Sequence, residues 1–121
     1  MAALFIAHLD ETEESSLEDP IRVKPGESAI ILGRNSEVLY SDFDPLIPGK
    51  QPLFLPDIVS KKDVDLLRLI RVAMDRPGHM VEANISFRST PMYARALHQE
   101  DYRTHIIFSA PKAGVGRKPR I

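Results

Sequence analysis

Four prolines interrupt the middle of the chain and divide it into two halves. The stretch DPLIPGKQPLFLPD, residues 44–57, contains Pro45, Pro48, Pro52 and Pro56. Each proline lacks a backbone N–H and restricts φ, so the segment cannot form a helix or a central strand of a sheet. The Pro-Gly pair within it is typical of a chain reversal. We therefore predict an extended or turning crossover between two structured parts.

The crossover also carries five large apolar side chains. They are Leu46, Ile47, Leu53, Phe54 and Leu55. They can cover an edge of the chain's own core, or they can insert into a neighbouring subunit. Stiff apolar arms lose less entropy on docking, which makes them effective assembly contacts. We expect most of them to pack on the chain's own core, with Phe54 and the pair Leu46 and Ile47 as the strongest candidates for contacting a partner.

The segment after the crossover predicts the main helix, over residues 61–75. Ser60 is a good N-cap, and Asp63 occupies the reciprocal position of a capping box. Val59 and Val64 fit the hydrophobic staple that often flanks such a start. Apolar residues then recur at helical spacings, and a Pro-Gly pair ends the pattern. The residues of this apolar stripe are Leu66, Leu67, Ile70, Ala73 and Met74.

Short strands are expected on both sides of the helix. The predicted strands cover residues 2–9, 29–32, 38–40, 81–87, 92–97 and 104–109. The second and third are separated by GRNSE, in which Gly33 and Asn35 tolerate the positive φ of a tight hairpin turn. Strand 81–87 alternates apolar and polar residues, and Pro91 interrupts the pattern that follows. This order predicts an α+β fold, with an antiparallel sheet of about four to six strands packed on one main helix.

Length and composition are those of a single soluble domain. A chain of 121 residues with 43% hydrophobic and 27% charged residues can bury one core. We divide it into an N-terminal strand and acidic linker at 1–20, one α+β domain at 21–110, and a basic, flexible tail at 111–121. With no cysteine, disulfides are excluded. The start of the chain lacks the basic region of a signal peptide, and no apolar run is long enough to span a membrane. We expect an intracellular or particle-associated protein without membrane contact.

The two ends of the chain carry opposite charge. The acidic residues of the linker are Asp10, Glu11, Glu13, Glu14, Glu18 and Asp19, and the basic residues of the tail are Lys112, Arg117, Lys118 and Arg120. The net charge of −1 provides no overall field for nucleic acid, so the tail alone would give weak, salt-sensitive binding to nucleic acid or to an acidic partner. Opposite charges at the two ends also suit contact between copies of the chain, or docking on a larger complex.

No sequence motif indicates catalysis. The chain has no G-x-S-x-G elbow, no cysteine nucleophile and no glycine-rich phosphate loop. Its four histidines lack the spacing of a metal site, and the closest cluster, HQEDYRTH, is more typical of a polar loop. We therefore expect no enzyme activity, no cofactor and no metal.

The order of a hairpin, a crossover, one long helix and three closing strands resembles a PAS-like sensor or dimerisation domain. The resemblance covers residues 28–109 and is carried by SKKDVDLLRLIRVAMDRPGHMVEANISFR, which looks like the helix-to-strand passage of that family. It implies dimerisation, or a small-molecule pocket between helix and sheet. The residues that would line this pocket are Ile31, Leu66, Ile70, Ile85 and Phe87.

Three functions follow from these patterns. The first is a non-enzymatic interaction or assembly subunit that forms a homo-oligomer or joins a larger complex through residues 44–57. The second is a PAS-like sensor or dimerisation domain. The third is a nucleic-acid-associated protein that uses its basic tail.

Overall fold

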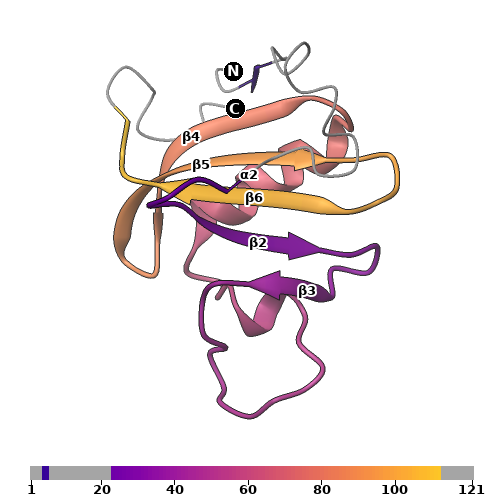
Figure 1. Ribbon diagram of the computed structural model, residues 1–121, viewed down its shortest axis with the longest axis vertical. Coiled ribbons are helices and arrows are strands. Elements are labelled where there is room, and N and C mark those ends of the chain that lie inside the picture. Colours follow the sequence, from indigo (N-terminus) through magenta and orange to yellow (C-terminus); the bar gives the residue numbers. More distant parts are fainter. Residues whose placement is uncertain (1–3, 6–22, 113–121) are drawn as a thin grey trace.

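Antiparallel strands build one sheet, and a single long helix packs against it in the described part of the chain (Figure 1). The computed structural model of the protein describes residues 4–5 and 23–112. The strands run in the order β1-β4-β5-β6-β2-β3. They are β1 (Leu4–Phe5), β2 (Ser28–Leu32), β3 (Val38–Ser41), β4 (Met80–Phe87), β5 (Thr90–His98) and β6 (Thr104–Ser109). The predicted α+β fold is confirmed. The acidic linker and Arg117, Lys118 and Arg120 of the tail lie outside the described residues.

Strands β2 and β3 form the predicted hairpin. Its turn is closed by a bond from the N–H of Gly33 to the carbonyl of Glu37 at 2.8 Å. The positive φ of this turn is at Ser36, with a value of 63°, and not at Gly33 or Asn35 as the sequence suggested. The register shifts by one residue between Ile31 and Leu32, which marks a β-bulge. Strand β3 is the last strand in the order of the sheet and so lies at its edge. The bulge bends this edge strand.

Helix α2 (Val64–Asp75) begins later than the predicted start at residue 61. Asp63 is its N-cap. Ser60 and Asp63 do form a reciprocal pair, because the N–H of Ser60 donates to Oδ2 of Asp63 at 3.1 Å, but the pair closes the turn before the helix. The predicted staple is wrong, since Val59 is buried whereas Val64 is 55% exposed.

The core lies between α2 and the face of the sheet that it covers. Helix residues Leu66, Leu69, Ile70 and Ala73 are buried in it, whereas Leu67 and Met74 of the predicted stripe are only partly buried. Two rings of the core stack, those of Phe87 and Phe108, with centroids 5.2 Å apart. The ring of Phe43, the residue directly before the crossover, lies edge-on against both at 4.9 and 5.1 Å. The crossover is therefore anchored to the core at its beginning.

Strands β4, β5 and β6 follow the predicted pattern with one difference. Val81, Ala83, Ile85 and Phe87 of β4 are buried, as the alternation indicated. Pro91 does not interrupt the next strand: it is the second residue of β5 and lies opposite Ser86 of β4. This position is near a strand start, where proline is tolerated. The turn between β4 and β5 consists of Arg88 and Ser89, with φ of 54° and 65°.

The opposite face of the sheet carries a second, smaller apolar cluster and an ion pair. The cluster consists of Ala29, Met80, Leu97 and Ile107. The guanidinium of Arg95 on β5 lies 3.0 Å from the carboxylate of Glu27, next to the start of β2. Because Arg95 lies on the face away from α2, it has no part in holding the crossover.

Candidate functional site

The crossover runs from the end of β3 to the short 3₁₀ helix η2 (Leu55–Asp57) and projects beyond the edge of the sheet (Figure 1). It reverses direction at Pro48 and Gly49, as predicted. The N–H of Lys50 lies 3.4 Å from the carbonyl of Ile47, and Gly49 has a φ of 80°, which glycine adopts without strain. The segment is thus a bent loop and not a straight extended arm.

Main-chain hydrogen bonds hold the second half of the crossover against the edge of the sheet. The N–H of Val38 donates to the carbonyl of Leu53 at 2.8 Å, and that of Leu55 donates to Ser36 at 2.9 Å. Glu37 and Phe54 form an isolated antiparallel bridge between these two bonds. Residues 53–55 therefore lie alongside residues 36–38, on the outer edge of the sheet where β3 starts.

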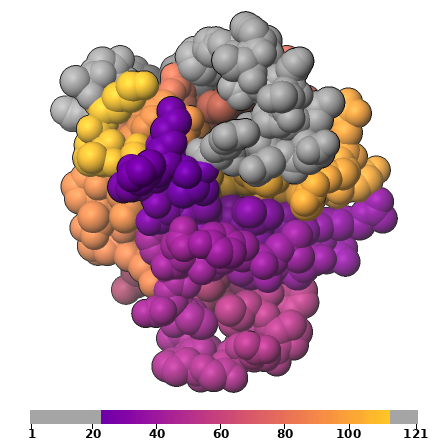
Figure 2. Space-filling model, viewed as in Figure 1, coloured from indigo at the N-terminus to yellow at the C-terminus, as the bar shows by residue number. Residues whose placement is uncertain are grey.

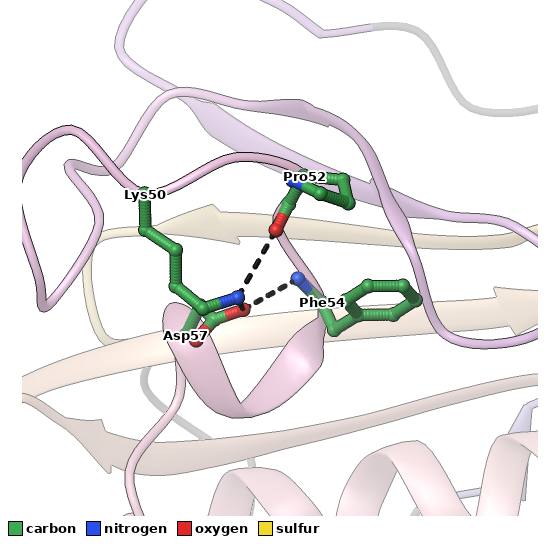
Figure 3. A network of polar contacts seen from close by, with 4 residues as sticks. All are labelled: Lys50, Pro52, Phe54 and Asp57. Carbon is green, nitrogen blue, oxygen red and sulfur yellow. Dashed lines mark hydrogen bonds and ion pairs between the residues drawn. The ribbon is translucent and has the colours of Figure 1, made fainter.

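Asp57 ties the two halves of the crossover together (Figure 3). Its Oδ2 accepts the N–H of Phe54 at 2.8 Å and lies 3.0 Å from the ammonium of Lys50, which also donates to the carbonyl of Pro52. The N–H of Leu46 donates to the carbonyl of Asp57 at 2.8 Å. The bond from Phe54 first, and the Lys50 ammonium second, lower the pKa of Asp57 below its ordinary value. Ionised Asp57 is therefore the form that holds the loop.

The five apolar side chains of the crossover divide into two groups. Leu53 and Leu55 are partly buried and pack against the core. Leu46, Ile47 and Phe54 are 44%, 58% and 38% exposed. We refer to these three exposed residues as the crossover surface. The sequence suggested these three as the candidates for leaving the core, but we expected most of the five to pack on it and only two do. A role in partner binding stays a prediction for all five.

Strand β3 adds two further exposed apolar residues beside this surface. Leu39 and Tyr40 are 53% and 49% exposed. Val38, which precedes them, packs against the core together with Leu53. Figure 2 shows β3 and the crossover as adjoining parts of the surface at one end of the molecule. The exposed apolar residues thus occur on neighbouring segments of the chain.

The residues predicted to line a ligand pocket do not line one here. Leu66, Ile70, Ile85 and Phe87 are at most 4% exposed and pack together in the core, whereas Ile31 is not part of that cluster. An open cleft of about 340 Å³ lies elsewhere, and none of the five residues lines it. Its lining residues come from the start of β2, the start of β5 and the end of β6. The described residues thus give no support to a pocket between α2 and the sheet.

Lys112 is the one basic residue of the predicted tail that the structure describes. Its N–H donates to Oδ1 of Asn84 at 2.9 Å, and its carbonyl accepts the side-chain amide of Asn84 at 2.9 Å. Its ammonium lies 5.0 Å from the ring centroid of Tyr93, within the range of a cation–π contact. Lys112 is therefore fastened to β4 and β5, and nucleic-acid binding by the tail stays a prediction.

Residues 4–5 and 23–112 contain no group of three or more histidines and carboxylates that could hold a metal ion. The ring of His98, from the HQEDYRTH stretch, lies with Nδ1 2.7 Å from the hydroxyl of Thr104 on β6. Within the same residues, no helix combines the length and the apolar character that crossing a bilayer requires.

No protein family, curated protein or solved structure was found to match the chain.

Proposed function

We propose that the protein is a non-enzymatic interaction subunit, which associates with further copies of itself or with a larger complex through the crossover surface. The observation that carries this proposal is the exposure of Leu46, Ile47 and Phe54 on a loop whose main chain is hydrogen-bonded to β3 and to itself. Apolar side chains that cluster on a surface mark interaction sites more often than single exposed ones do.

The bracing of the loop supports docking because it lowers the entropy lost on binding. A segment that is disordered before binding must be ordered at the expense of affinity. Here Asp57 already fixes the course of the main chain through Phe54 and Lys50. The main chain of Leu46 is held as well, because its N–H donates to the carbonyl of Asp57. Less main-chain order is therefore lost when the side chains of this part of the loop are buried against a partner.

The size of the surface suggests reversible rather than obligate association. A standard interface buries about 800 Å² on each partner, which is more than three half-exposed side chains can supply. We propose that Leu39 and Tyr40 of β3 contribute to the same contact. An interface of this size is expected to form at high concentration and to dissociate on dilution.

Sedimentation of the full chain over a wide range of concentration tests the proposal. We expect the average mass to rise with concentration, and Ile47→Asp and Phe54→Asp to suppress the rise by at least about tenfold in dissociation constant. Val64→Asp is the matched control, because Val64 is similarly exposed but lies at the start of α2. A native chain that stays monomeric at millimolar concentration would rule out self-association, and an equal effect of all three variants would place the contact elsewhere.

A PAS-like dimerisation or sensor role is the second candidate, and the element order favours it. The hairpin β2–β3, the crossover, α2 and the three strands β4 to β6 follow one another as the resemblance requires. Dimerisation fits better than sensing, because four of the five pocket residues are packed in the core. A specific small molecule that raises the midpoint of thermal unfolding would favour sensing instead, since a ligand of the folded state stabilises it.

A further inference from the structure

Arg88 connects the turn between β4 and β5 to both ends of the crossover. Its Nη2 donates to the carbonyl of Asp44, where the crossover begins, and to the carbonyl of Ile58, just after η2, at 3.0 Å. These two carbonyls are far apart in the sequence, and a single guanidinium holds them together. The crossover is therefore closed at its base by one side chain from a distant turn.

The surroundings of Arg88 indicate a structural clamp rather than a free surface charge. The central carbon of its guanidinium lies 5.3 Å from the ring centroid of Phe87 and 5.8 Å from that of Phe43. Its Nε is buried without a hydrogen-bond partner, and none of the ion pairs of the described residues includes it. Burying an unpaired N–H is costly, so the two carbonyl bonds and the aromatic contacts must offset it.

The main chain of Arg88 is held as well. Its N–H donates to Oδ1 of Asp63 at 2.9 Å, and Oδ2 of the same carboxylate accepts the N–H of Ser60. Asp63 is buried, with 6% of its surface exposed. The turn that carries Arg88 is thus hydrogen-bonded to the start of α2, which holds the main chain from which the guanidinium extends.

We infer that Arg88 is a positioning residue for the crossover surface, an inference that rests on the proposed function. It holds the main chain at Asp44 and Ile58 and thereby sets where Leu46 and Ile47 lie, without itself contacting the partner. A lysine should take over this role only in part, because its ammonium is a point charge on a flexible stem and lacks the planar group that lies near the rings of Phe87 and Phe43.

The test compares Arg88→Met and Arg88→Lys with Arg95→Met in the full chain. Arg95 is the matched control, since it is also a partly buried arginine with one Nη2 contact, but on the other face of the sheet. Two quantities are measured: amide hydrogen exchange of Leu46 and Phe54 against that of Ile106 in β6, and the dissociation constant of self-association.

We expect Arg88→Met to speed exchange at Leu46 and Phe54 by about tenfold or more, which corresponds to the loss of two hydrogen bonds, with a smaller change at Ile106. Self-association should weaken by a similar factor. Arg88→Lys should recover only part of either quantity, and Arg95→Met should alter neither.

Two outcomes overturn the inference: unchanged exchange in the crossover of Arg88→Met, or equal acceleration in the crossover and in β6, which would indicate a loss of global stability alone. If the exchange result is as expected but the native chain never associates, the proposed function fails while the hold of Arg88 on the crossover stands. If the native chain associates through Ile47 and Phe54 and Arg88→Met leaves this unchanged, the inference fails and the proposed function stands.

Discussion

The carboxylate of Asp63 accepts a hydrogen bond from the main-chain N–H of Arg88 at 2.9 Å, across 25 positions of the sequence. The sequence pattern identifies Asp63 as part of a helix cap, but its Oδ1 accepts a hydrogen bond from the turn between β4 and β5. The other oxygen accepts the N–H of Ser60, which closes the turn before α2. One buried carboxylate therefore links the turn before α2 to the turn between β4 and β5.

Asp63→Ala should be among the more destabilising substitutions of a charged residue. It leaves the N–H groups of Ser60 and Arg88 without their acceptor, so we expect the free energy of unfolding to fall by about 2–4 kcal/mol. Asp63→Asn keeps the shape and one oxygen, and should cost about half as much. Denaturant unfolding measures both. Asp65→Ala, in the first turn of the same helix, is the control and should cost less than about 1 kcal/mol. A loss for Asp63→Ala no larger than that of the control would contradict the prediction.

The hold of Asp57 on the crossover should weaken in acid. The N–H of Phe54 and then Lys50 lower the pKa of this carboxyl below its ordinary value of 3.8. A carboxyl with a lowered pKa in the folded state stabilises that state fully above its ordinary pKa, and the contribution disappears as the pH falls through the lowered value. Titration of the Asp57 carboxyl followed by NMR should show this, with the amide signal of Phe54 moving in step.

Lys50→Met sharpens the prediction for Asp57. Because the main-chain bond from Phe54 is the larger cause, the pKa of Asp57 should rise in this variant but stay below its ordinary value. Asp101 provides a comparison, since its pKa is also lowered, first by the N–H of Arg103. Asp101→Asn should leave the exchange of crossover amides unaltered. A return of Asp57 to its full ordinary pKa in Lys50→Met would show that the lysine dominates.

Replacing an aromatic residue by alanine should destabilise the monomer strongly in the core and only slightly in the crossover. Phe87 is fully buried beside Phe43 and Phe108, so Phe87→Ala should lower the free energy of unfolding of the monomer by about 3–5 kcal/mol. Phe54 is exposed, and Phe54→Ala should cost about 1 kcal/mol or less in the monomer. The comparison requires dilute protein, so that association does not contribute. A cost for Phe54→Ala as large as that for Phe87→Ala would mean that Phe54 serves the fold and not a partner.

Tyr40 should ionise above its ordinary value of 10.0, because its hydroxyl donates to Asp42, whose negative charge further opposes a phenolate. Asp42→Asn should lower this pKa. The difference between the alkaline absorbance titrations of the native chain and of Tyr40→Phe isolates this tyrosine from the others. The stabilisation is present below the ordinary pKa and is lost as the pH rises through the raised one. An Asp42→Asn titration identical to the native one would contradict the contact.

The parts of the fold that the sequence predicts are those with a local physical signal. The hairpin, the helix and strand 81–87 each show a period or a turn that neighbouring residues create on their own. The buried residues Leu66, Leu69, Ile70 and Ala73 follow the spacing i, i+3, i+4, i+7, so Leu69 fits a simple helical period. The predicted stripe was displaced toward Leu67 and Met74, which are only partly buried, and therefore left Leu69 out. The helix starts at Val64 and not at residue 61, and the carboxylate of Asp63 accepts main-chain N–H groups of Ser60 and of Arg88 in the β4–β5 turn.

The sequence predicted the location of the candidate site but not the side chains that hold the crossover in place. Proline spacing is enough to identify the crossover and to suggest that Leu46, Ile47 and Phe54 face outward. Nothing near Arg88 in the sequence indicates that its partners are Asp44, Ile58 and Asp63, because these contacts are long-range. The partners of Asp57 are only three and seven positions away, but they meet it only because the loop reverses direction between them.

The bridge between Glu37 and Phe54 affects whether strands of other chains can pair with the edge of the sheet. A strand at the border of a sheet is a template on which further strands can add without limit, and fibrils grow in this way. Here the crossover already occupies the outer side of the chain at Glu37, and the bulge in β3 bends what remains. Addition of strand upon strand is thereby discouraged, whereas contact through side chains stays open. The crossover thus covers the border of the sheet at Glu37, where a further strand would otherwise pair.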